Sequence, residues 1–138
     1  MRIYICGSMN FAKQMLEAKS RVEELGHSVM VPPDTSECLE NPGLNMDLEH
    51  CFKNNILEDC FKKIAEHDAI LILNYEKDGI KGYVGGATLM EIGLAFYLGK
   101  KIFLLYPPPK IEDQRYSIEI QLAKPIVLEG NLDLIKNV

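Results

Sequence analysis

The sequence predicts a doubly wound α/β fold around one parallel sheet of five strands. Segments typical of buried strands alternate with amphipathic helical segments along the whole chain, and this alternation produces a parallel sheet with helices on both faces. The 138 residues are 47% hydrophobic and 25% charged, which suits one globular domain over residues 1–138. The simplest strand order for such a chain is 2-1-3-4-5, the flavodoxin-like (Rossmann-like) arrangement.

The first two predicted strands flank a helix. Arg2 to Cys6 forms the first strand, and apolar residues then recur at helical spacing from Phe11 to Leu25 before Gly26, a typical helix C-terminal glycine. Ser28 to Val31 forms the second strand. Pro32 to Asn45 contains three prolines and an Asn-Pro-Gly turn signal, so we expect a surface loop there. Long loops in compact domains are often functional.

The central part of the chain predicts two more strands and two helices. Leu48 to Ile64 has the spacing of one amphipathic helix, and the apolar run from Ala69 to Leu73 is typical of a buried central strand. A polar, glycine-rich segment follows, then a helix from about Thr88 to Leu98 and a strand from Ile102 to Leu105. The last part should contain a proline break, a short helix, a fifth strand and a terminal turn: Pro107–Pro109, Ile111–Ala123, Ile126–Leu128 and the residues from Leu132.

Composition and motifs exclude several classes of function. No signal peptide and no apolar run of roughly 20 residues is visible, so we expect a cytoplasmic protein without a membrane partner. A net charge of -5 disfavours binding to a nucleic acid polymer. The cysteines form no CxxC pair and the histidines lie in unrelated segments, so we expect reduced thiols, no metal and no cofactor. The turn CGSMNF matches neither a dinucleotide nor a P-loop motif.

The segment from Gly82 to Gly93 contains the residues best suited to chemistry. Ligands of doubly wound sheets bind beyond the carboxyl ends of the strands, at the switch point between strands one and three, where this segment should meet Gly7-Ser8. Its glycines allow close approach of backbone N–H groups to a ligand. A carboxylate at Glu91 could attack the anomeric carbon of a bound sugar or stabilise an oxocarbenium-like transition state.

A structural interpretation of the same residues competes with this one. Thr88-x-x-Glu91 fits a capping box, in which the glutamate only satisfies a backbone N–H, and Gly85-Gly86 could serve only to turn the chain. Spacing alone favours the capping box.

Two blocks of sequence resemble the nucleoside 2-deoxyribosyltransferase superfamily and its hydrolytic branch, the 2'-deoxynucleoside 5'-phosphate N-hydrolases. The blocks are Tyr4-Ile5-Cys6-Gly7-Ser8 and Gly86-Ala87-Thr88-Leu89-Met90-Glu91-Ile92-Gly93-Leu94-Ala95, with Gly99-Lys100-Lys101-Ile102 following. The resemblance covers most of the chain in order. The pattern from Gly85 to Glu91 is also similar to that of phosphoribohydrolases that release cytokinin bases. Both resemblances imply cleavage of an N-glycosidic bond in a small nucleoside or nucleotide.

The resemblance implies roles for individual residues. Glu91 would be the nucleophile, Tyr4 would hydrogen-bond the nucleophile or the substrate, and water would be the acceptor. A serine from a neighbouring subunit binds the phosphate in the hydrolases, which implies a homodimer or higher homo-oligomer with shared active sites. The residues expected to bind substrate are Gly7, Ser8, Asn10, Gly85, Gly86, Ala87, Thr88 and Ser117.

The sequence also departs from the family pattern. Asn10 replaces an arginine of the hydrolases, which removes one partner of a 5'-phosphate. The family's helical aspartate falls on Cys60, and the adjacent Asp59 is a candidate substitute although neighbouring helix positions point about 100° apart. Gly85 replaces an aspartate of the transferases, which favours hydrolysis over transfer. Asp68 opens a strand at the far end and is expected to be structural.

Two alternatives to an enzyme remain open. A noncatalytic nucleotide-binding module would keep the pocket without the helical aspartate, and a partner-binding α/β domain would bind no nucleotide. The nucleobase, the choice between ribose and deoxyribose, and the need for a phosphate are not determined by the sequence.

Overall fold

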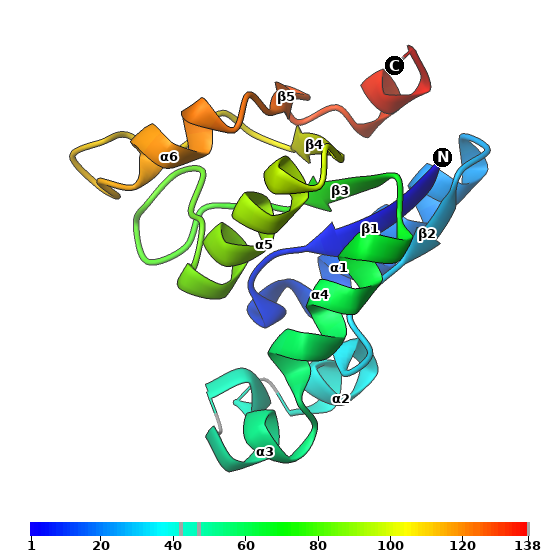
Figure 1. Ribbon diagram of the computed structural model, residues 1–138, viewed down its shortest axis with the longest axis vertical. Coiled ribbons are helices and arrows are strands. Elements are labelled where there is room, and N and C mark those ends of the chain that lie inside the picture. The colour runs from blue at the N-terminus through cyan, green and yellow to red at the C-terminus, as the bar shows by residue number, and fades with distance from the viewer. Residues whose placement is uncertain (42, 47, 138) are drawn as a thin grey trace.

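The computed structural model describes residues 1–41, 43–46 and 48–137 and contains a five-stranded parallel sheet (Figure 1). The strands are β1 Arg2–Cys6, β2 Ser28–Met30, β3 Ala69–Ile72, β4 Lys101–Leu104 and β5 Ile126–Val127. The helices are α1 Ala12–Glu24, α2 Thr35–Glu40, α3 Leu48–Lys53, α4 Ile56–Glu66, α5 Gly86–Tyr97 and α6 Ser117–Leu122, with 3-10 turns η1 Met9–Phe11, η2 Leu44–Met46 and η3 Leu132–Asn137. The order β2-β1-β3-β4-β5, parallel throughout, confirms the predicted fold.

Alternating side chains along the strands divide the core into two layers. Ile3 and Ile5 of β1 pack in the layer that includes α1, whereas Tyr4 and Cys6 pack in the layer that includes α4, α5 and α6. Successive strand residues point to opposite faces, so every second residue of β1 belongs to each layer. Figure 1 shows α4 and α5 side by side on one face of the sheet, with α1 on the other. Cys6, at the end of β1, therefore faces the layer of α5.

The prediction of a loop over Pro32 to Asn45 is wrong in part, because this segment contains α2 and the start of η2. Thr35 and Cys38 are buried on one face of α2, and the Thr35 hydroxyl donates to the carbonyl of Pro32 at 2.6 Å. This helix is too short to show an apolar period in the sequence. Pro42 of the predicted turn lies outside the described residues.

The prediction of a single helix over Leu48 to Ile64 is also wrong, because this segment forms two helices, α3 and α4. Asn55 adopts a left-handed conformation (φ 48°, ψ 44°), which asparagine tolerates better than most residues. The Asn54 side chain donates to the carbonyl of His50 at 2.9 Å and helps to end α3. Apolar residues on both sides of the break kept helical spacing, so the pattern did not reveal it.

Buried amides hold the segment between β3 and α5. The Asn74 side chain donates to the carbonyl of Tyr106 at 2.8 Å and accepts from its N–H at 2.9 Å. Gln114 pairs in the same way with Val84, accepting from its N–H and donating to its carbonyl, both at 2.9 Å. These contacts join the segment to the chain after β4, and they fix where α5 begins.

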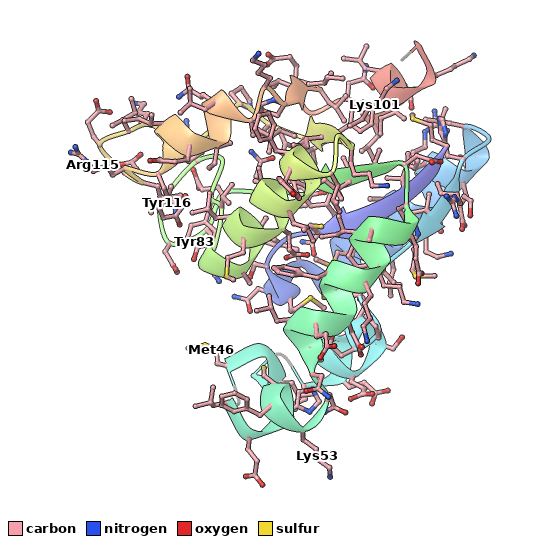
Figure 2. All side chains as sticks on the ribbon, viewed as in Figure 1. Met46, Lys53, Tyr83, Lys101, Arg115 and Tyr116 are labelled. Carbon is pink, nitrogen blue, oxygen red and sulfur yellow. The ribbon has the colours of Figure 1, made fainter. Side chains whose placement is uncertain are left out.

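The helix predicted from Ile111 to Ala123 is shorter in the structure, because its first residues take part in the contacts with Val84. α6 begins only at Ser117, because the preceding residues turn to place Gln114 and Tyr116 against Val84. Figure 2 shows Tyr116 and Tyr83 on the same flank of the molecule, near the amino-terminal end of α5. No described helix has both the length and the apolar composition to cross a bilayer.

Gly82 should be essential for this packing, whereas Gly79 should not. Both have positive φ, 73° and 77°, but a Cβ at Gly82 would lie 2.3 Å from the carbonyl oxygen of Pro107, and one at Gly79 would meet nothing within 4 Å. Gly79→Ala should lower the free energy of unfolding by about 1 kcal/mol through backbone strain, and Gly82→Ala by roughly 1–3 kcal/mol more. Urea denaturation measures both, and equal losses would contradict the packing described here.

Candidate active site

A pocket of about 450 Å³ opens at the carboxyl edge of the sheet, the edge where the parallel strands end. Its volume lies in the range of small-molecule sites. The residues that line it come from the end of β1, from the chain after β1, β2 and β3, and from α3, α4 and α5: Cys6, Gly7, Ser8, Met9, Pro32, Asp34, Cys51, Ile56, Leu57, Cys60, Lys77, Tyr83, Gly85, Gly86, Ala87, Thr88, Met90 and Glu91. This is the switch point between β1 and β3 at which a ligand was expected.

Glu91 reaches the pocket from the second turn of α5. The helix begins at Gly86 after Gly85 as the N-cap residue, which makes no side-chain cap. A capping box would require Thr88 at the N-cap, so that interpretation is wrong. The Glu91 side chain is instead buried, with 6% of the residue exposed. Its carboxyl group therefore serves the pocket and not the helix terminus.

Burial makes Glu91 a weaker acid than an exposed glutamate. It raises the pKa of Glu91 to about 7, against a smaller lowering effect of a hydrogen bond from the Cys6 thiol. Burial also raises the pKa of Cys6 well above its ordinary value, with the Glu91 charge adding to the effect. The thiol is therefore protonated and able to donate to the carboxylate. A carboxyl group that titrates near neutral pH in a pocket is typical of a functional site.

Tyr4 and Cys60 form a neutral pair beneath the pocket. The Tyr4 hydroxyl donates to Cys60 Sγ at 3.3 Å, and Tyr4 is fully buried. Burial raises the pKa of Tyr4 and raises that of Cys60 to about 11. Cys60 lines the pocket, whereas neither Tyr4 nor Asp59 does. Tyr4 thus contacts a residue of the pocket lining without lining the pocket itself.

The structure brings most of the predicted binding residues together. Those that line the pocket with Glu91 are Gly7, Ser8, Gly85, Gly86, Ala87 and Thr88. Asn10 and Ser117 do not line it. Asn10 is exposed, and its N–H donates to Ser8 Oγ at 3.3 Å. Ser117 is fully buried, and its hydroxyl donates to the carbonyl of Pro109 at 2.5 Å.

Lys77 is a pocket residue that sequence analysis missed. Asp78 and Gly79, both at positive φ, form a tight turn that pairs the backbone of Lys77 with that of Ile80. Lys77 Nζ then donates to Ser8 Oγ at 3.1 Å and lies 5.0 Å from the centre of the Tyr83 ring. The Asp-Gly turn signal could have indicated a hairpin here, but not the direction of the lysine.

Asp34 is the second pocket residue that sequence analysis missed. It lies just before α2 and is 6% exposed. Cys38 Sγ donates to Asp34 Oδ2 at 3.5 Å, and His50 Nε2 lies 3.9 Å from the same oxygen. Its position shortly after β2 follows the rule that predicted Gly7 and Ser8, so the strand order could have indicated it.

Comparison with known proteins gives a match of fold. No protein-family model matches the sequence, and a search of curated proteins finds no match. A CMP N-glycosidase shares the fold. The structure of this enzyme, BcmB from Clostridium botulinum, superimposes with a TM-score of 0.56 and 21% sequence identity, over 99% of this chain and 98% of that chain. At this level of identity the likeness shows a common fold.

Burial of Glu91 should make the protein less stable as pH rises. The folded-state pKa of about 7 exceeds the ordinary value of 4.5, so between these values the folded state retains a proton that the unfolded state has lost. Stability is therefore lost as pH rises through this window, by roughly 3 kcal/mol in total. Glu91→Gln should escape this loss, so its free energy of unfolding relative to wild type should rise by a similar amount from pH 4.5 to pH 8.

Urea denaturation at the two pH values measures the effect. Glu112→Gln, which removes an exposed carboxylate, is the matched control and should differ from wild type by the same amount at both. If Glu91→Gln behaves like this control, burial does not penalise the Glu91 charge.

Proposed function

We propose that the protein hydrolyses the N-glycosidic bond of a nucleoside 5'-monophosphate, with Glu91 as the nucleophile. The observation that supports this most is a buried glutamate, with a pKa of about 7, at the switch point of a fold shared with a CMP N-glycosidase. The pocket of about 450 Å³ has room for a ligand of nucleotide size. The sequence resemblance to enzymes that cleave N-glycosidic bonds agrees with this proposal.

The chemistry needs two displacements at the anomeric carbon. The Glu91 carboxylate forms a bond to that carbon while the bond to the base breaks, and the electron pair of the broken bond leaves with the base, which takes up a proton. Water then attacks the glycosyl ester and loses a proton, which balances the one taken up by the base; this step returns the carboxylate and gives the free sugar phosphate with retained configuration. The Cys6 thiol, which donates to Glu91, would hold the carboxylate in position. Cys60, with a pKa of about 11, would hydrogen-bond the substrate as a neutral group.

A cation and a helix terminus at one side of the pocket support a substrate with a 5'-phosphate. Lys77 Nζ and Ser8 Oγ are within 3.1 Å of each other, and both line the pocket together with the first turn of α5. That turn contains no acidic residue and has no side-chain cap, so its N–H groups and dipole favour an anion. Lys77 would thus replace the arginine whose position Asn10 occupies.

Other properties of the chain support a cytoplasmic homodimer as part of the proposal. Cys6, Cys38 and Cys60 are free thiols, which is typical of a reducing compartment. Large apolar side chains of α5 are exposed, among them Phe96 at 54% and Tyr97 at 85%, and such surfaces mark interaction sites. In the proposal the homodimer forms through this surface of α5.

Base release should depend on Glu91 and on pH. Wild type should release free base from 5'-monophosphates, and Glu91→Gln should reduce the rate by at least about 10³-fold, because an amide is not a nucleophile. For wild type, kcat/KM should rise with pH through about 7, as Glu91 loses its proton. Chromatography of free base at matched concentrations of folded protein measures both. Binding without release by either protein would instead favour the noncatalytic nucleotide-binding module.

Lys77 should distinguish phosphorylated from unphosphorylated substrates. Lys77→Met should raise KM for a 5'-monophosphate by roughly tenfold or more, the value of a charged hydrogen bond, and should leave KM for the nucleoside nearly unchanged. Lys81→Met is the matched control, because Lys81 is exposed and lies outside the pocket. Equal effects of Lys77→Met on both substrates would contradict a phosphate site at Lys77.

A further inference from the structure

Asp34 and Lys77 line the pocket from opposite sides of β1. β1 lies between β2 and β3 in the sheet; Asp34 follows β2, and Lys77 follows β3. On the Asp34 side, the pocket is lined by Ile56 and Leu57 of α4. A nucleotide with its phosphate at Lys77 and its anomeric carbon at Glu91 would therefore extend its base toward Asp34.

One oxygen of the Asp34 carboxyl group accepts a hydrogen bond within the protein, and the other accepts none from the described residues. Oδ2 accepts from Cys38 Sγ at 3.5 Å, and His50 Nε2 lies 3.9 Å from it. Oδ1 is shielded from solvent and has no hydrogen-bond partner among the described residues. A buried acceptor without a partner is unfavourable. The χ2 torsion of aspartate has a broad range, so a small rotation would present this oxygen to a donor in the pocket.

We propose that Asp34 recognises the nucleobase by accepting a hydrogen bond from an exocyclic amino group, so that the pocket selects amino-bearing bases. The inference rests on the proposed function for the identity of the ligand as a nucleotide. It assigns a role in specificity to a residue of the β2 side, whereas Glu91 acts at the sugar and Lys77 at the phosphate.

The chemistry of the base edge decides which bases fit. An ionised carboxylate accepts hydrogen bonds and donates none, so it requires an N–H or O–H group on the ligand. An exocyclic amino group projects from the ring and offers two donors. The ring N–H of uracil lies between two carbonyl oxygens, and that of hypoxanthine lies next to one, and the carboxylate repels these oxygens. Cytosine, adenine and guanine should therefore be preferred over uracil, thymine and hypoxanthine.

Base preference in an isosteric variant tests the inference. Wild type should show higher kcat/KM for CMP than for UMP and for AMP than for IMP. Asp34→Asn, whose amide also donates, should reduce both ratios by roughly 10- to 100-fold, the value of a hydrogen bond to a charged group. Glu37→Gln is the matched control, because it removes an exposed carboxylate from α2 and should leave the ratios unchanged. Thermal melting of each variant checks folding.

Equilibrium binding separates the inference from the proposed function. Titration calorimetry in a Glu91→Gln background, with and without Asp34→Asn, gives Kd for the same four nucleotides and for dCMP. Turnover with base ratios that Asp34→Asn does not change would overturn the inference and leave the proposed function standing. Binding with a base preference that Asp34→Asn removes, but without turnover by wild type, would overturn only the proposed function.

Two further results would overturn the assignment of Asp34 to the base. In one, Asp34→Asn changes the ratio of the Kd values for CMP and dCMP and leaves the ratios between bases unchanged. This result would assign Asp34 to the sugar hydroxyl. The other is the absence of binding by any of these nucleotides, which would overturn both proposals.

Discussion

The position of the Glu91 carboxyl group between α5 and the end of β1 is the constraint on which the site depends. A charged carboxylate is costly to bury, and here burial raises its pKa to about 7. The surrounding structure compensates in part, because the Cys6 thiol donates to the carboxylate and because α5 is held by many other contacts. Asn74 and Gln114 fix the segment before this helix through buried hydrogen bonds to the backbone, and so hold in place the helix that carries Glu91.

The titratable groups directly beneath Glu91 are neutral. Tyr4 and Cys60 form a hydrogen-bonded pair whose pKa values burial raises, and Cys6 is protonated for the same reason. These groups offer hydrogen bonds to Glu91 and to a ligand without adding a second negative charge close to the carboxylate. Because burial raises the pKa of Cys60 to about 11, this residue adds no negative charge that would raise the pKa of Glu91 further.

Charge is distributed unevenly across the pocket. Lys77, Ser8 and the amino-terminal turn of α5 form a positive side, and Asp34 forms a negative side beyond β1. A ligand with an anion at one end and hydrogen-bond donors at the other would bind in one orientation, which is the polarity of a nucleotide with an amino-bearing base. The apolar side chains between the two sides favour a flat, poorly hydrated group.

The sequence by itself determined the sheet, its strand order and the position of Glu91 at the carboxyl edge. These follow from local periodicity and from the rules of chain connection, which need no knowledge of side-chain partners. It did not determine the break at Asn55, the short helix α2, or the places of Lys77 and Asp34, because each depends on contacts between segments distant in the chain. Tertiary structure also decided that Thr88 does not cap α5 and that Ser117 is buried. A capping box and a buried carboxylate share one spacing in sequence. Only the tertiary structure, in which α5 begins at Gly86 and packs against β3, β4 and α4, distinguishes them.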